Sequence, residues 1–240
     1  MPPPGPAPAG PEIIGHRGAP RAYRENTLAS FREAVALGAD AIELDVHVTR
    51  DGAVVVHHDP VPRARATDEA LNGRPFGELT LAQVRTFMLD GGLAIPTLAE
   101  VLAEVDGHAF VYVEVKGQHA EQAVAELLGP EVGWSAVHAF DHRIVARVRA
   151  LVPGLRGGVL LESYLIDTPS AMRAAGALDL WQRWEFIDEP LVREVHDAGG
   201  RVIAWTVNDV AAAERLAGMG VDGICTDLPG ALGPALRRRT

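Results

Sequence analysis

Residues 41–48 read Ala-Ile-Glu-Leu-Asp-Val-His-Val, with apolar and polar side chains in strict alternation. This two-residue period is typical of a β-strand. One face would hold Ile42, Leu44, Val46 and Val48, and the other Glu43, Asp45 and His47. We expect the apolar face to pack outward against helices, and the polar face to point inward.

Similar short β-like runs recur on both sides of this stretch. With it they are residues 13–15, 41–48, 54–57, 110–116, 136–140, 158–161, 178–184, 201–207 and 223–226. Helical patterns lie between most of them, notably at 27–37, 141–151 and 209–217, each with an N-cap candidate and a Gly or Pro stop. Two further segments, at 80–83 and 97–100, fit capping boxes.

Strand, helix and strand in repetition predict a parallel sheet with helical crossovers. The first strand is followed by no Gly-rich phosphate loop, so we favour a TIM (β/α)8 barrel over an open doubly wound sheet. Nine runs are one more than such a barrel needs. The link at 49–52, Thr-Arg-Asp-Gly, is too short for a parallel crossover and predicts an antiparallel hairpin. One hairpin strand is therefore an addition, and the sequence does not say which.

The composition fits one folded domain. The chain has 240 residues, 48% of them hydrophobic and 22% charged, which allows a sizeable core and excludes a disordered chain. The net charge of -10 disfavours nucleic acid and anionic membrane surfaces as partners. An anionic ligand would need a local positive site, made by basic side chains or a metal ion.

The ends of the chain and its cysteine content bear on location. A lone Cys225 excludes an intrachain disulfide, which fits the cytoplasmic location that we expect. Residues 1–11 are rich in Pro, Ala and Gly and lack the regions of a signal peptide, so we expect a disordered tail before a single domain at 12–240. No apolar run reaches the roughly 20 residues of a spanning helix, so we expect no stable membrane anchor. The oligomeric state stays open.

The first strand ends in Gly15-His16-Arg17-Gly18, which places a proton carrier beside a fixed cation. In a barrel, the carboxyl ends of the strands face the mouth where active sites lie. Glycine on both sides would let the backbone come close to a ligand. A single histidine near a strand end is more often structural, so this motif gains weight only beside other polar strand ends.

Three carboxylates point to a metal site. Glu43 and Asp45 would lie roughly 7 Å apart on one strand face and repel each other, and a bound cation is the simplest compensation. Glu114 adds a third carboxylate, with Lys116 on the same face of its strand. Such oxygen ligands favour Mg²⁺ or Ca²⁺ over zinc. The alternatives are a half-solvated strand face and a simple Glu114–Lys116 ion pair.

Four more residues stand at strand ends. His57 and His58 are adjacent, so strand geometry lets at most one point into the site, without saying which. Trp205 is a candidate apolar wall for a substrate, although a tryptophan in this position is more often part of the core. Asp227 receives only a structural role, in holding the last loop.

Taken together, these segments resemble the glycerophosphodiester phosphodiesterase family, whose barrel is that of PLC-like phosphodiesterases. The matching segments run in the family's order and cover roughly residues 12–228. They are GHRG at 15–18, ENT at 25–27, IELDV at 42–46, HD at 58–59, IPTL at 95–98, VEVK at 113–116, WTVN at 205–208 and GVDG at 220–223.

The resemblance implies hydrolysis of small glycerophosphodiesters to an alcohol and glycerol 3-phosphate. It implies His16 and His58 as the acid–base pair, and so selects His58 over His57. Arg17 and Lys116 would contact the phosphate. The implied ligands of one divalent cation, Mg²⁺ or Ca²⁺, are Glu43, Asp45 and Glu114.

The chain departs from the family pattern in places. Arg24 stands where members often have proline, and Arg65-Ala66-Thr67 replaces their usual Arg-Thr-Thr. Residues 59–107 include the family's insertion, which we expect to be compact. Within it Phe76, Met88, Leu89 and Leu93 are candidates for an apolar lip. The acidic charge and the lack of an anchor nevertheless favour a soluble head-group substrate over a bilayer lipid.

Three other classes remain open. A zinc amidohydrolase would need His-x-His on the first strand, where this chain has His16-Arg17-Gly18. A non-catalytic binding barrel would be free to lose catalytic groups, yet both histidines and all three carboxylates are present. A phospholipase of the sphingomyelinase D or phosphatidylinositol-cleaving type shares the early His and Glu-x-Asp pattern, so only substrate profiling separates it.

Overall fold

The computed structural model describes residues 10–237, so residues 1–9 of the predicted tail lie outside the described residues. The sheet contains β1 (Glu12–His16), β2 (Ala41–Val48), β3 (Val54–Val56), β7 (Phe110–Val115), β8 (Ser135–Ala139), β9 (Arg156–Leu161), β10 (Asp179–Arg183), β11 (Arg201–Trp205) and β12 (Gly223–Thr226). Each of these strands matches a predicted run, with ends shifted by two residues at most.

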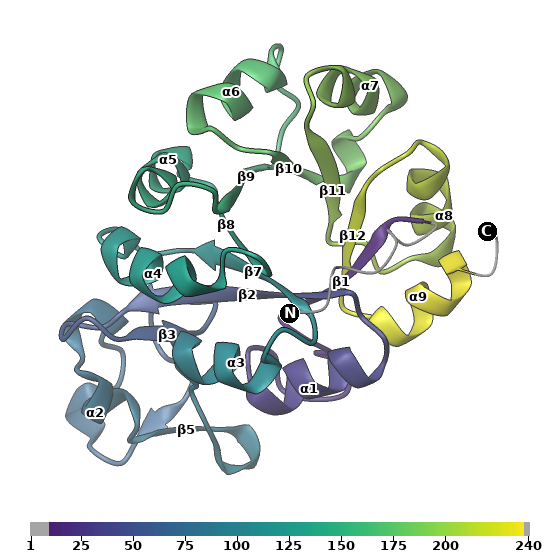
Figure 1. Cartoon of the computed structure of the whole chain (residues 1–240). Coiled ribbons are helices and arrows are strands. Elements are labelled where there is room, and N and C mark those ends of the chain that lie inside the picture. Colours follow the sequence, from purple (N-terminus) through teal and green to yellow (C-terminus); the bar gives the residue numbers. More distant parts are fainter. Residues whose placement is uncertain (1–9, 238–240) are drawn as a thin grey trace.

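Eight of the strands form a closed parallel barrel. Their order is β1-β12-β11-β10-β9-β8-β7-β2, and β1 pairs with β2 to close the ring. Helices surround the ring (Figure 1). They are α1 (Leu28–Ala36), α3 (Leu98–Val105), α4 (Glu121–Leu128), α5 (His142–Leu151), α6 (Thr168–Ala175), α7 (Glu189–Asp197), α8 (Val210–Gly218) and α9 (Pro229–Arg237). The predicted TIM barrel is confirmed.

The hairpin ambiguity is resolved by strand pairing. β2 pairs in parallel with both β1 and β7, whereas β3 pairs with β2 in antiparallel register, Val48 opposite Val54, and also forms an isolated antiparallel bridge from Val55 to Thr97. β2 is therefore the barrel strand and β3 the addition.

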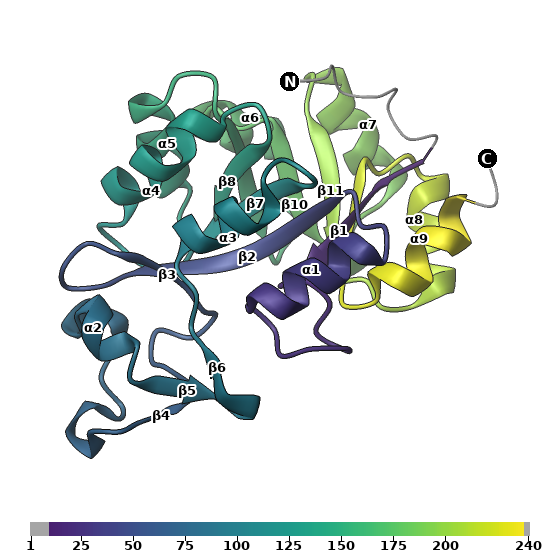
Figure 2. The same ribbon diagram turned by 60° about the horizontal axis from the view of Figure 1, so that its bottom comes forward.

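A small unit follows β3 and projects from the side of the barrel (Figure 2). It contains α2 (Leu81–Val84) and an antiparallel sheet of β4 (Arg65–Ala66), β5 (Phe87–Leu89) and β6 (Leu93–Ala94). Its own apolar core includes Phe76 and Leu89, which are 1% and 4% exposed. The prediction of an apolar lip was therefore wrong for these two residues, because they pack in the interior of the unit. Of the four candidates for this lip, only Met88, at 46%, is largely exposed.

Helix starts follow the sequence signals. The three predicted helices are α1, α5 and α8, and their N-caps Thr27, Asp141 and Asp209 each accept a hydrogen bond from a backbone N–H of the first turn. Both capping boxes, at Thr80 and Thr97, are present with side chain and backbone bonded reciprocally. Each such cap stabilises a helix by about 1 kcal/mol.

Because side chains alternate between the two faces of each strand, the protein has one apolar core outside the barrel and another inside it. The outward residues Ile42, Leu44 and Val46 are fully buried in the large core between the strands and the helices. A second cluster fills the inside of the barrel and consists of Ile14, Ala41, Tyr112, Ala136, Leu160, Trp181, Ile203 and Cys225. Because this layer fills the barrel, the polar strand ends above it form the floor of a site at the mouth.

A charged network closes the opposite end of the barrel, at the amino-terminal ends of the strands. Tyr112 donates to Glu12 at 2.7 Å and accepts from Arg156 at 2.6 Å. Arg201 binds Glu12 at 2.8 Å and Asp179 at 3.2 Å. Every carboxylate of this network has an arginine partner, so the charges are compensated within the barrel.

Within residues 10–237, none of the helices combines the length and the apolar character that crossing a lipid bilayer requires.

Candidate active site

The turn after β1 is shaped by two glycines and one strained residue. A side chain on Gly15 would come within 2.6 Å of the Gly18 carbonyl, and one on Gly18 within 2.4 Å of Ser30 Oγ. The glycines thus allow the chain to fold closely on itself and on α1. The predicted close approach of this backbone to a ligand stays a prediction. Arg17 adopts the left-handed conformation, with φ of 54°. This turns its backbone N–H toward Glu43 Oε2, at 3.1 Å.

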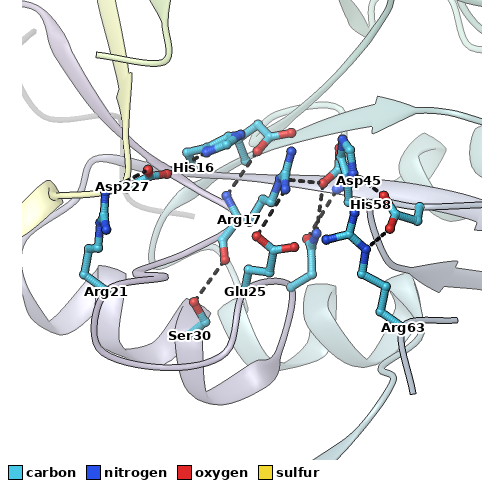
Figure 3. Close-up of polar contacts among 12 residues, drawn as sticks. His16, Arg17, Arg21, Glu25, Ser30, Asp45, His58, Arg63 and Asp227 are labelled. Carbon is cyan, nitrogen blue, oxygen red and sulfur yellow. Dashed lines mark hydrogen bonds and ion pairs between the residues drawn. The ribbon is translucent and has the colours of Figure 1, made fainter. Parts of the chain in front are cut away.

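His16, at the end of β1, is paired with a carboxylate from the other end of the chain. Its Nδ1 lies 2.7 Å from Asp227 Oδ1 (Figure 3). Asp227 is itself held by Asn208, whose amide Nδ2 donates to Oδ2 at 2.7 Å. Against the opposing effect of burial, the hydrogen bond and charge of His16 lower the pKa of Asp227. The ring is thereby oriented with Nε2 away from the carboxylate.

His58 has a similar arrangement. Its Nδ1 lies 2.8 Å from Asp59 Oδ1, and Arg63 forms an ion pair with the other oxygen of Asp59. The neighbouring His57 points elsewhere: its Nε2 accepts a hydrogen bond from Arg63 N at 3.1 Å, and its ring packs on Phe76. Burial lowers the pKa of His57 to about 4, which keeps this ring neutral.

Two buried acids lie side by side below the histidines. Glu43 and Glu114 are 2% and 6% exposed. Burial, then the charges of Asp45 and Glu114, raise the pKa of Glu43 well above its usual range. Burial and Asp45 raise the pKa of Glu114 to about 7, although Lys116 Nζ lies only 2.7 Å from its Oε1. Burial and mutual repulsion therefore disfavour ionisation of both acids at once.

Asp45 differs from these two acids because cations surround it. Arg17 Nε lies 3.0 Å from its Oδ2 and Lys116 Nζ 3.2 Å from its Oδ1. Asn26 Nδ2 also donates to Oδ2 at 2.9 Å. Despite burial, these partners lower the pKa of Asp45 to about 2. Asp45 is thus ionised and fixes both cations at the mouth. Figure 3 shows its contact with Arg17.

A buried histidine that the sequence analysis did not single out completes this group. His138 on β8 is 1% exposed, and its Nε2 lies 3.8 Å from Glu43 Oε1. Glu43, Glu114 and His138 each offer one ligand atom, and these atoms lie within 4.8 Å of one another. Burial lowers the pKa of His138 to about 3, which leaves the imidazole neutral. The structure thus assembles one group of two carboxylates and one imidazole.

A cavity of about 130 Å³ opens above this group. Seven of the eight predicted site residues line it: His16, Arg17, Glu43, His58, Glu114, Lys116 and Trp205. Asp45, the eighth, contacts two of these residues from below. Trp205 meets Phe140 edge to face, with ring centroids 5.7 Å apart, and the two form an apolar side of the cavity. None of the predicted site residues lines a larger cavity of about 560 Å³, which lies beside α6 and is lined by residues such as Arg149, Met172 and Arg173.

The sequence assigned only a structural role to Asp227, and it assigned no separate role in the site to Asp59. Both are now the carboxylate partners of histidines in the cavity wall. The signal for Asp227 was its place directly after β12, because ring closure sets β12 beside β1. The signal for His138 was the inward phase of β8, on which Ala136 also points into the barrel.

The chain is similar to known proteins along almost its whole length. Residues 16–231 match the model of the glycerophosphoryl diester phosphodiesterase family. A glycerophosphodiester phosphodiesterase from Caldanaerobacter subterraneus is 32% identical over 237 residues, covering 90% of this chain and 94% of that protein. A glycerophosphodiester phosphodiesterase structure from Agrobacterium tumefaciens gives a TM-score of 0.80 at 25% identity, covering 93% of this chain and 99% of that chain. The fold also matches an Oleispira antarctica phosphodiesterase solved with the product sn-glycerol-3-phosphate, with TM-score 0.83, 24% identity and coverage of 94% and 96%.

Proposed function

The chain belongs to the glycerophosphoryl diester phosphodiesterase family and hydrolyses glycerophosphodiesters, and we propose that it does so with His16 and His58 as an acid–base pair beside one divalent metal ion. The products would be an alcohol and glycerol 3-phosphate. The observation that carries this proposal is that both histidines line one cavity and each has Nδ1 on a carboxylate.

The acid–base roles follow from that geometry. A carboxylate on Nδ1 fixes the ring and leaves Nε2 to exchange a proton with a ligand in the cavity. One histidine would take a proton from the nucleophile, which is water or the glycerol hydroxyl of the substrate. If the hydroxyl attacks, a cyclic glycerophosphate forms, and water would then open it in a second step to give glycerol 3-phosphate. The other would give a proton to the oxygen of the leaving alcohol as the P–O bond breaks. Both rings have Nδ1 on a carboxylate, so this arrangement equips either histidine for either role.

Arg17 and Lys116 are proposed to hold the phosphate. Both side chains line the cavity, and both are positioned by Asp45. Burial opposes the charge of Arg17, but Asp45, Glu43 and Glu25 overcome it and raise its pKa. Donors that are fixed before the substrate arrives stabilise charge on the phosphate oxygens without reorganisation.

A divalent cation fits the residues that are present. Glu43 and Glu114 are buried close together, and burial and the neighbouring carboxylates raise the pKa of both, so that a bound cation would favour the ionised form of the two acids. We propose Glu43, Asp45 and Glu114 as ligands, with Mg²⁺ or Ca²⁺ as the ions that carboxylates alone would favour. Such an ion would polarise a phosphate oxygen and neutralise developing charge.

The substrate class and the location are also proposals. We propose a soluble diester substrate that binds without a lipid surface, because the cavity of about 130 Å³ suits a head group and no helix in residues 10–237 could span a membrane. We also propose a cytoplasmic location, because the single cysteine, Cys225, is a buried free thiol and such thiols are typical of a reducing compartment.

The test is a screen of glycerophosphodiesters for release of glycerol 3-phosphate, with and without a chelator and added divalent ions. We expect activity to disappear on chelation and to return with metal. Full activity in a demonstrably metal-free preparation would overturn the metal proposal. If a different phosphate product is released and no glycerol 3-phosphate is found, the activity would instead be that of the related phospholipases.

A further inference from the structure

We propose that His138 is a direct ligand of the metal ion, and that the site therefore prefers a first-row transition ion such as Mn²⁺, Co²⁺ or Zn²⁺ over Mg²⁺ or Ca²⁺. This inference rests on the metal site of the proposed function and changes its ligand chemistry. A site of Glu43, Asp45 and Glu114 offers only oxygen, which suits the hard ions. Adding the imidazole of His138 gives a mixed nitrogen and oxygen site.

The strand register brings His138 to the carboxylates. On β8, Ala136 and His138 point into the barrel, while Val137 packs outward in the large core. His138 is the register partner of Glu114 on the neighbouring β7. Inward side chains of paired residues have Cβ atoms about 5 Å apart, so the imidazole stands directly beside the carboxylate of Glu114.

The ring of His138 is held rigidly by its surroundings. It stacks on Trp181 with centroids 4.2 Å apart and planes at 4°, and Tyr112 contacts it edge-on. Gly158, its register partner on β9, makes this possible: a Cβ there would lie 2.7 Å from the Trp181 ring and 3.1 Å from His138 Cβ. A fixed ring loses little entropy on binding a metal ion, as a ligand residue should.

The hydrogen bonds of His138 are unsatisfied. Its Nδ1 has no hydrogen-bond partner, although the side chain is 1% exposed. Its Nε2 lies 3.8 Å from Glu43 Oε1, which is too long for a hydrogen bond. A buried imidazole without partners is unusual in a native protein. A structural histidine would donate to one of the adjacent carboxylates, whereas a ligand histidine leaves room for an ion between them.

The spacing of the three ligand atoms suits one shared ion. They lie within 4.8 Å of one another. Nitrogen and carboxylate ligands bind transition ions at about 2.0–2.2 Å, so atoms on opposite sides of one ion are about 4 Å apart. Glu43, Glu114 and His138 would therefore hold the ion after a small adjustment of the two carboxylates. Imidazole binds ions later in the first-row series more tightly, which gives the expected selectivity.

The first experiment measures binding without catalysis. Metal-stripped protein is titrated calorimetrically with Mn²⁺, Co²⁺, Zn²⁺, Mg²⁺ and Ca²⁺. We expect the wild type to bind the transition ions at least about tenfold more tightly than Mg²⁺ or Ca²⁺. His138→Gln should weaken Mn²⁺ and Co²⁺ binding by at least about 10- to 100-fold and change Mg²⁺ binding little. His47→Gln is the matched control, since His47 is also buried on a barrel strand but stacks on Phe76 outside the cavity.

The second experiment takes its main signal from the wild type, so that signal does not depend on folding of a mutant. Pulsed electron paramagnetic resonance of the Mn²⁺-loaded wild type should show hyperfine coupling to an imidazole ¹⁴N, and His138→Gln should lose it. Bound Mn²⁺ without nitrogen coupling would overturn the assignment of His138, as would unchanged Mn²⁺ affinity in the variant.

Failure of this inference can be distinguished from failure of the proposed function by one further variant. If Glu114→Gln abolishes binding of every ion while His138→Gln changes none, the carboxylate metal site stands and only the His138 ligand is refuted. If Glu114→Gln leaves binding of every ion intact, the metal site of the proposed function is refuted with it.

Discussion

His16 Nδ1 lies 2.7 Å from Asp227 Oδ1, although 211 residues separate the two in the chain. Closure of the barrel sets β12 beside β1 and makes this contact possible. Asp227 fixes the imidazole and would stabilise its protonated form during proton transfer. It is a positioning residue, because it acts through His16.

We therefore expect Asp227→Asn to lower kcat by about 10²-fold with little change in KM, because the amide keeps the size but not the charge of the carboxylate. Steady-state kinetics on a glycerophosphodiester checks this. Asp222→Asn is the control, since Asp222 pairs with His196 at 2.9 Å outside the cavity. Equal kcat losses in both variants would mean that Asp227 has only a structural role.

The two histidines should act as a unit. His16→Ala and His58→Ala should each lose about 10² to 10⁴ in kcat, with a smaller change in KM. The double variant should lose less than the product of the two. His57→Ala should be nearly silent in catalysis, because His57 contacts Arg63 N and Phe76 instead of the cavity. A large loss at His57 with little at His58 would reverse this assignment, and a mild effect at His16 would remove the acid–base pair.

The network at the closed end of the barrel should make stability depend on pH. Burial raises the pKa of Asp179 to about 6, although Arg156 and Arg201 oppose the shift and Glu12 adds to it. An unfolded aspartate titrates near 3.9. Between about pH 4 and pH 6 the folded chain therefore holds more protons than the unfolded chain. Stability contributed by Asp179 is full below this window and falls by up to about 3 kcal/mol as pH rises through it.

Asp179→Asn should remove this slope, because the amide mimics the protonated carboxyl at every pH. Urea unfolding followed by circular dichroism from pH 4 to pH 7 gives the free energy of unfolding of both proteins. We expect the stability of the wild type minus that of the variant to decrease from pH 4 to pH 6 and then to level off. A difference that is constant with pH would show that Asp179 stays ionised beside its arginines.

A soluble diester should be a better substrate than a lipid. Phe76 and Leu89 are buried in the side unit, so they cannot form a surface that inserts into a bilayer. We expect kcat/KM for a deacylated glycerophosphodiester to exceed that for a lysophospholipid with the same head group. Faster cleavage of the lysophospholipid would show that exposed residues near the mouth, such as Tyr164 and Phe186, bind an acyl chain.

Much of the fold was predictable because strand periodicity is a local property. The alternation in residues 41–48 correctly separated Ile42, Leu44 and Val46, which face the helices, from Glu43, which faces the cavity. The hairpin could not be resolved in the same way. Residues 54–56 are as apolar as a barrel strand, and only pairing with β7 shows that β2 is the member of the ring.

Site residues could be predicted from the sequence where their position follows from the phase of one strand. Contacts between side chains from different segments could not be predicted in this way. Side-chain phase places Glu114 and Lys116 at the mouth, and they line the cavity. Phase alone does not say that Asp45 would be surrounded by Arg17, Lys116 and Asn26, since those contacts arise from three separate segments. Whether Asp45 binds metal stays a prediction.

Because the interior of the barrel is filled, substrate and products can reach the site only through the mouth. Trp181 and Tyr112 occupy the middle of the barrel at 1% and 0% exposure, and the network of Glu12 and Arg201 seals the far end. Substrate entry and departure of both products must then share the mouth beside His16 and His58. The alcohol, which lacks the phosphate that we propose Arg17 and Lys116 to hold, would leave first. Glycerol 3-phosphate would be the last to leave and should compete with incoming substrate, so that turnover slows as this product accumulates.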